Sequence, residues 1–253
     1  MWHLLAFAES QGIAASNEIL AGVADPQFSR SANLSFQLPS PHYIGWMYAG
    51  AAGFTNGRIN NGTFNNRGRP QLYPFNRAVL PPTNQNVIDL REFPIRLSQM
   101  EDFRIDTSND AAGAENTYVL SGVWKELPNF NVNSRDMRWL RFTASVTATV
   151  LTWSTLGSIT LDENLEHGRY GVYGMALQGT NVVAGRLLFS GQAYRPGCIG
   201  KATLGLVDRN LFLGGLGFWG EFTTYSLPQI ETIENVTGAS SLIGWLLTSY
   251  IGP

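Results

Sequence analysis

The sequence predicts an all-β protein of the β-sandwich or jelly-roll type, with long loops and little helix. Short segments rich in Thr, Val and aromatic residues recur along the chain, and turn residues such as Gly179, Gly191 and Asp208 separate them. Segments with helical periodicity are nearly absent, so the chain lacks the strand–helix alternation of an α/β fold. With 253 residues, 44% of them hydrophobic, the chain can bury one large core or two smaller ones.

The N-terminal part is the least regular. Residues 1–29 are expected to form a segment apart from a β-rich jelly-roll body over 30–253, and within them residues 2–22 favour a short helix that Gly12 interrupts. A weak boundary at 126–136 divides a loop-rich half from a strand-rich half. The sequence therefore leaves open a single elaborated jelly roll or a double one.

Eleven segments are expected to be strands because apolar and polar residues alternate in them or β-branched and aromatic residues dominate. They are residues 33–38, 42–48, 87–97, 103–107, 117–124, 139–153, 158–161, 170–177, 182–190, 202–207 and 217–225. The clearest is 139–153, whose apolar face comprises Leu140, Phe142, Ala144, Val146, Ala148 and Val150. Residues 56–70, dense in Asn and Gly, predict a long interaction loop. The apolar run 242–251 is about half the length of a membrane span.

The basic residues are unusual in kind. Only Lys125 and Lys201 are lysines among 17 basic residues, and charged residues make up 14% of the chain, where about 25% is ordinary. Subunit interfaces are poor in Lys and rich in Arg and aromatic residues. This composition indicates a surface covered by neighbouring copies; a codon bias toward arginine is the alternative, but it would not lower the total charge. The candidate interface residues are Arg58, Arg67, Arg69, Trp46, Trp124 and Trp219.

Several functional classes lack support in the sequence. A single cysteine, Cys198, and three histidines exclude a disulfide framework and argue against a metal centre, and no cofactor is implied. The motifs G-x-S-x-G, H-E-x-x-H and the P-loop are missing, so no enzymatic activity is predicted. A formal net charge of -2 gives no pull toward nucleic acid or an anionic membrane.

Three local motifs have ordinary structural interpretations. Residues 215–220 match G-x-G-x-x-G, but a strand rather than a helix is expected to follow, so the fingerprint of dinucleotide binding is incomplete. Residues 162–169 gather three carboxylates and His167 without the spacing of a calcium loop, which favours a solvated connection. In Arg195-Pro-Gly-Cys198 the arginine could activate the thiol, although a lone cysteine is more often a small buried residue.

The arginine bias, the Asn/Gly/Pro-rich loops and the closely spaced strands resemble viral coat proteins of the jelly-roll type, including those of small icosahedral bacteriophages. The likeness covers residues 30–230 and is strongest in 139–153, 168–177 and 181–189. It implies a major capsid protein of a virion, a structural subunit that self-assembles as trimers or pseudo-hexamers into an icosahedral shell. Residues 1–29 contain no Lys or Arg, unlike the basic arm of many genome-binding coat proteins. The resemblance thus implies weak nucleic-acid binding, with another virion protein or an internal membrane as further partners.

Two other functions remain open. A carbohydrate-binding module or adhesin would need some of Trp46, Tyr48, Trp124 and Trp219 to face solvent beside amide or carboxylate groups. A β-rich hydrolase would need two carboxylates about 5–10 Å apart in a groove. Its candidates are Asp162, Glu163 and Glu166.

Overall fold

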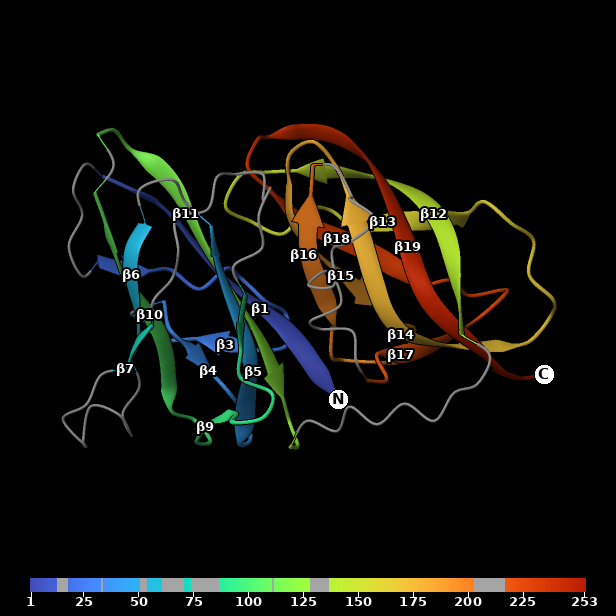
Figure 1. Ribbon diagram of the computed structural model, residues 1–253, viewed down its shortest axis with the longest axis horizontal. Coiled ribbons are helices and arrows are strands. Elements are labelled where there is room, and N and C mark those ends of the chain that lie inside the picture. Colours follow the sequence, from blue (N-terminus) through green and yellow to red (C-terminus); the bar gives the residue numbers. More distant parts are fainter. Residues whose placement is uncertain are drawn as a thin grey trace. The chain divides into compact units, whose positions relative to one another are not determined.

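The computed structural model describes residues 1–12, 18–32, 34–50, 54–60, 71–73, 87–110, 112–127, 137–202 and 217–253 (Figure 1). Every regular element in these ranges is a strand, and among them there is no helix long and apolar enough to cross a membrane. The strands are β1 (Trp2–Gln11), β2 (Glu18–Leu20), β3 (Ser29–Arg30), β4 (Phe36–Gln37), β5 (His42–Gly50), β6 (Phe54–Asn60), β7 (Gln71–Tyr73), β8 (Val87–Asp89), β9 (Ile95–Leu97), β10 (Asp102–Asn109), β11 (Glu115–Trp124), β12 (Met137–Ala148), β13 (Gly157–Leu161), β14 (Arg169–Gln178), β15 (Val182–Leu188), β16 (Gly197–Lys201), β17 (Gly220–Thr223), β18 (Gln229–Glu234) and β19 (Gly238–Gly252).

The chain divides into two compact units. The N-terminal unit is Leu5–Pro128, and the C-terminal unit is Asn129–Pro253 together with Met1–Leu4. The division falls within the stretch 126–136. Residues 1–29 are shared between the two units, because β1 begins in the C-terminal unit and continues in the N-terminal one.

The C-terminal unit pairs its strands in a nested order. The outermost strands β12 and β19 pair along twelve residues, and inside them β13 pairs with β18, β14 with β17, and β15 with β16, all antiparallel. The pairs β19–β14 and β18–β15 then join these ladders into the sheets β12-β19-β14-β17 and β13-β18-β15-β16. A long hairpin wound into two sheets in this way is a jelly roll.

The two sheets are also joined at their sides. β13 pairs with β12 through residues 159–161 and with β18 through residues 157–158, so it changes sheet along its length. β16 does the same, with an antiparallel ladder to β15 and two parallel pairings to β14. Seven strands therefore form a closed ring, with β17 added on the side of β14. Closure leaves these seven without an unpaired edge along which another chain could add a strand.

The N-terminal unit repeats this order. Its sheets run β1-β11-β5-β8 and β3-β4-β10-β6-β7, with β2 also on β10 and β9 also on β5. The nested pairs are β1 with β11, β2 and β4 with β10, β5 with β8, and β6 with β7. The protein is thus a double jelly roll, which decides between the two alternatives that the sequence left open.

The helix expected over residues 2–22 is wrong. Trp2–Gln11 form β1, and the seven side chains from Trp2 to Ala8 are all buried. A strand covered on both faces is apolar without alternation, so its sequence resembles that of a buried helix. Pairing with β11, more than a hundred residues away, decides the conformation.

Other predicted bounds also change. Residues 56–60 of the predicted loop 56–70 belong to β6, while 61–70 lie outside the described residues. The strand expected at 202–207 is preceded by β16 at Gly197–Lys201, where a turn was expected; 203–207 are not among the described residues. Residues 33–38 contribute only the two-residue β4, and 87–97 divide into β8 and β9. The longest strand, β19, was not predicted at all.

Two tryptophans of the N-terminal unit pack over glycines on the paired strands β5 and β11. Trp46 lies opposite Gly122, and a methyl group on Gly122 would overlap its indole ring. Trp124 lies in the same way over Gly45. Each glycine leaves space above the sheet for a ring, so both indoles are buried.

We expect Gly122→Ala to destabilise the protein by about 1–3 kcal/mol, because the added carbon displaces the Trp46 ring from a filled core. A Cβ on Gly113 would meet nothing within 4 Å, so Gly113→Ala is the control. Chemical denaturation of both variants checks this expectation. Equal stability of the two variants would contradict the packing described.

A buried ionic cluster fixes the start of β1 inside the C-terminal unit. Arg186 on β15 is fully buried and donates from Nε to Glu231 on β18 at 2.5 Å, and Arg195 donates to the same carboxylate oxygen. Arg186 also donates to the Leu4 carbonyl (3.2 Å) and lies 3.8 Å from the centre of the Trp153 ring. His3 accepts the backbone N–H of Arg195 at Nδ1 (2.9 Å), and its Nε2 lies 3.1 Å from Arg186 Nη1.

Removing the Arg186 guanidinium by Arg186→Met should cost about 3–5 kcal/mol, because Glu231 keeps its buried charge and loses one of its two cations. Arg169→Met is the control: its 4.0 Å pair with Glu221 is half exposed and worth less than about 1 kcal/mol. Urea unfolding at neutral pH measures both. A loss at position 186 no larger than at 169 would show that the cluster does not stabilise the unit.

Candidate functional site

The three predicted interface tryptophans lie in the core. The exposed fractions are 1% for Trp46, 6% for Trp124 and 4% for Trp219, whose ring packs edge-on against Trp2 at 5.1 Å. Tyr48 is also buried, and its burial raises the pKa of the phenol. None of these rings offers a surface to a neighbouring subunit or to a sugar, so the proposed sugar platform of Trp46, Tyr48, Trp124 and Trp219 is wrong.

The predicted arginine cluster is only partly described. Arg58 is half-buried on β6, whereas Arg67 and Arg69 lie outside the described residues. Elsewhere, arginines are paired within the chain: Arg91 with Asp89 at 2.6 Å, for example, and Arg141 with Asp162. Arginine therefore also serves the single chain, as an ion-pair partner.

An apolar row lies on the outer face of the sheet β12-β19-β14-β17. Along β12 the inward residues are buried and the alternate residues point outward, and the register places Trp139 beside Leu247 and Arg141 beside Trp245. Ile243 follows on β19. Trp139 is 40% exposed, the three β19 side chains are half-buried, and the Arg141 guanidinium lies 6.0 Å from the Trp245 ring. We call these five residues the outer-face patch.

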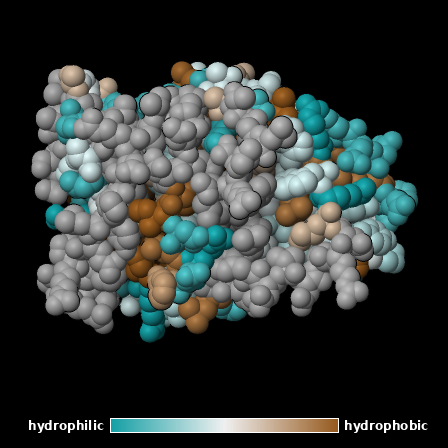
Figure 2. Space-filling model, in the orientation of Figure 1, coloured by the Kyte–Doolittle hydropathy of each residue, from teal (hydrophilic) through white to brown (hydrophobic). Residues whose placement is uncertain are grey.

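The outer-face patch departs from the usual pattern of a β-sandwich, whose outer sheet faces are polar. It combines aromatic and aliphatic groups with an arginine, and it has no lysine. Lys201 is buried, and burial lowers its pKa, so Lys125 is the one exposed lysine of the chain. Over the C-terminal unit, at the right of Figure 2, hydrophobic residues interrupt a hydrophilic surface.

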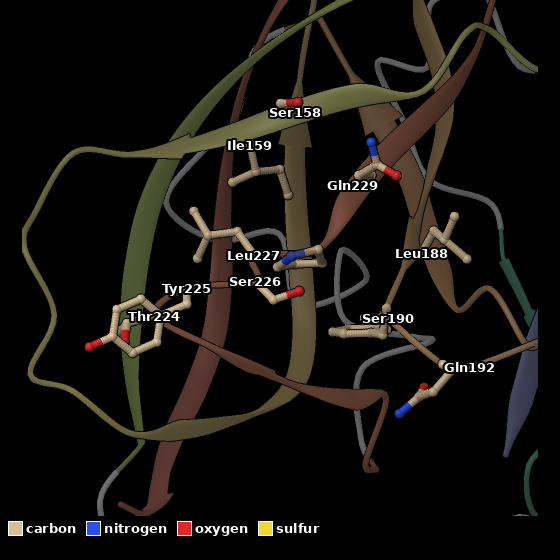
Figure 3. Close-up of a pocket in the computed structure, with 13 residues that line it drawn as sticks. Ser158, Ile159, Leu188, Ser190, Gln192, Thr224, Tyr225, Ser226, Leu227 and Gln229 are labelled. Atoms are coloured by element: carbon tan, nitrogen blue, oxygen red, sulfur yellow. The ribbon is translucent and has the colours of Figure 1, made fainter.

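A second feature is a pair of adjoining hollows in the C-terminal unit. Three connections between its sheets line them: β13–β14, β15–β16 and β17–β18. Figure 3 shows the first hollow, lined by residues 158–159, 188–192 and 224–229. The hollows measure about 670 and 620 Å³. Both are lined by Ile159, Thr224, Tyr225 and Leu227, which makes them two parts of one groove. We call it the loop groove.

The acidic segment 162–169 contributes one of its carboxylates, that of Glu163, to the loop groove. Asp162 is paired with Arg141, and Glu163, which lines the groove, lies 3.9 Å from Arg138. Glu166 is exposed and not among the groove residues. In the part of the chain that the structure describes, no group of three or more His, Cys, Asp or Glu side chains could hold a metal ion.

The remaining motifs have structural roles. β17 begins at Gly220, so the strand expected after residues 215–220 is present where a pyrophosphate site would need a helix N-terminus. Cys198 lies on β16 and is buried, and burial raises the pKa of its thiol far above the usual value. Arg195 is directed to Glu231 instead of the thiol.

Comparisons with known proteins give one finding. The chain matches no protein-family model and no curated protein. Among solved structures it is similar to the major capsid protein P2 from bacteriophage PM2, with 11% sequence identity, a TM-score of 0.27 and coverage of 100% of both chains.

The native Cys198 thiol should resist Ellman's reagent from pH 7 to 9. A raised pKa keeps the thiol protonated over this range, and the thiolate is the reacting species. Absorbance of the released thionitrobenzoate at each pH from 7 to 9 measures the reaction, and unfolding in guanidinium should expose one fast-reacting thiol per chain. A stoichiometric reaction of the folded protein within minutes would contradict the burial of this side chain.

Proposed function

We propose that this chain is a structural subunit that self-assembles through side-chain faces, as a major capsid protein of an icosahedral virion, and that it catalyses no reaction. The outer-face patch carries the proposal. An interface core is apolar and aromatic, arginine is enriched there, and lysine is depleted. The patch has this composition on a sheet face that would be polar in a protein that remains solitary.

The closed ring of the C-terminal unit limits how copies can associate. Because its seven strands are paired on both sides, β17, which lies outside the ring, is the described strand of this unit beside which a neighbour could add a strand. Association through this unit is therefore left mainly to sheet faces and loops. A face that carries exposed Trp139 and half-buried Trp245 is suited to such contacts, since tryptophan and arginine dominate the binding energy of interfaces.

The repeated fold supports the expected trimer or pseudo-hexamer. Two jelly rolls of the same strand order in one chain mean that three copies supply six modules of one type. Six similar modules around a threefold axis can tile a surface nearly as six identical subunits do. Jelly rolls serve both as shell proteins and as lectins, so the fold alone does not choose between these functions.

In addition to copies of itself, the chain is proposed to contact another virion protein or an internal membrane. The lack of Lys and Arg in residues 1–29 and the net charge of -2 support weak direct binding to nucleic acid.

Sedimentation velocity over a concentration series tests the proposal. Wild-type protein should sediment as trimers or larger assemblies, and Trp245→Ala should weaken self-association by about 30-fold, equivalent to about 2 kcal/mol for an interface tryptophan. Thr147→Ala, at an exposed position farther along β12, is the control and should leave association unchanged. A wild-type chain that stays monomeric at the highest concentration would overturn the proposal.

Because Trp245 also packs on its own sheet, circular dichroism and a thermal melt must show that Trp245→Ala folds. The more exposed Trp139→Ser provides a second variant of the same patch. If both variants fold and assemble as well as the wild type, the outer-face patch is not the contact.

A further inference from the structure

The loop groove is open, mainly uncharged and bordered by hydroxyl and amide groups. Its polar lining comes from Ser158, Thr160, Asn164, Ser190, Gln192, Ser226 and Gln229, spread over all three connections. Its apolar lining is Ile159, Leu161, Leu165, Leu188, Phe189, Leu227 and Pro228. Apolar surface beside convergent polar groups, in hollows of about 300–1,000 Å³, is typical of small-ligand sites.

One aromatic ring stands free of the core at the centre of this groove. Tyr225 lies where the two hollows meet and is 82% exposed, the highest value among the large hydrophobic residues described. The His167 ring stacks on it at 5.3 Å, with 11° between the planes. Figure 3 shows Tyr225 at the edge of the first hollow, beside Thr224. Exposing an aromatic ring to water is unfavourable, and here the stacked His167 ring also restricts the orientation of Tyr225.

We infer that the loop groove binds a neutral oligosaccharide, with Tyr225 as the stacking platform. A sugar ring has an apolar C–H face that packs on an aromatic ring, and hydroxyls around its edge that exchange hydrogen bonds with amides and hydroxyls. The groove supplies both kinds of partner. Its two hollows on either side of Tyr225 suit a chain of several sugar units better than a single one.

The charges of the lining argue for a neutral ligand. No Lys or Arg is among the described residues that line the two hollows, so a phosphate, sulfate or carboxylate group would find no cation there. The one carboxylate, on Glu163, lies 3.9 Å from Arg138. A nucleotide or an acidic glycan is therefore disfavoured.

Two sequence expectations bear on this inference. The sequence left open a sugar platform at Trp46, Tyr48, Trp124 and Trp219, which are buried, and a hydrolase site among Asp162, Glu163 and Glu166. The structure places part of that segment, Glu163 and His167, beside the exposed Tyr225. The inference is independent of self-assembly, because all of its residues belong to one unit of one chain.

Saturation-transfer NMR and isothermal titration of the full chain test the inference. The probes are maltohexaose, cellohexaose, laminarihexaose, chitohexaose and a galactohexaose, with sialyllactose and heparin hexasaccharide as acidic comparators. At least one neutral probe should bind, and its affinity should fall about tenfold or more in Tyr225→Ala but be retained in Tyr225→Phe. Gln229→Ala should weaken the same probe by a smaller factor.

Phe93→Ala is the matched control, since this ring is 81% exposed in the other unit and should not affect binding. The inference is overturned if no neutral probe binds at millimolar concentration, if only the acidic probes bind, or if Tyr225→Ala binds as well as the wild type. Sedimentation of the same samples separates the two proposals: sugar binding without assembly overturns only the proposed subunit role, and assembly without sugar binding overturns only this inference.

Discussion

The nested pairing of distant strands sets the position of every other element in each jelly roll. In the C-terminal unit β12 and β19 hold each other along twelve residues, although about ninety residues separate them in the chain. Every inner pair depends on this outer ladder for its position, because each lies within the loop that the outer pair closes. Forming such non-local contacts costs the conformational entropy of closing a long loop, so they form slowly. β13 and β16 then close seven of the eight strands into a ring, with β17 outside it.

The buried cluster around Arg186 adds directed polar contacts to this strand arrangement. A buried guanidinium is costly unless its donors are used, and Glu231, the Leu4 carbonyl and the Trp153 ring together surround it. Because Leu4 and His3 belong to β1, the cluster joins the beginning of the chain to strands almost two hundred residues away. The first residues of β1 therefore belong to the C-terminal unit and the rest of the strand to the N-terminal unit, although residues 1–29 were expected to form a segment of their own.

The two candidate surfaces of the C-terminal unit differ in chemistry. The outer-face patch lies on regular strands, where backbone pairing fixes the spacing of Trp139, Trp245 and Leu247, as a rigid interface requires. The loop groove lies on three connections, where hydroxyl and amide side chains surround the exposed Tyr225. A shell subunit with both would associate with its copies through a sheet face and meet a sugar through its loops.

Alternation and residue counts were enough to predict the all-β class, the inward face of the strand expected at 139–153, and the exclusion of a disulfide framework; the strand itself ends at Ala148. It could not identify β1, whose burial on both faces removes alternation, or place the tryptophans, since a large ring suits a core and an interface equally. In β19 the buried residues Leu242, Gly244 and Leu246 alternate with Ile243, Trp245 and Leu247, which point outward. Because the outward residues are also apolar, the sequence shows no alternation of apolar and polar residues there. Strand order, the loop groove and the outer-face patch could be found only in the folded chain, because each joins residues that long-range pairing brings together.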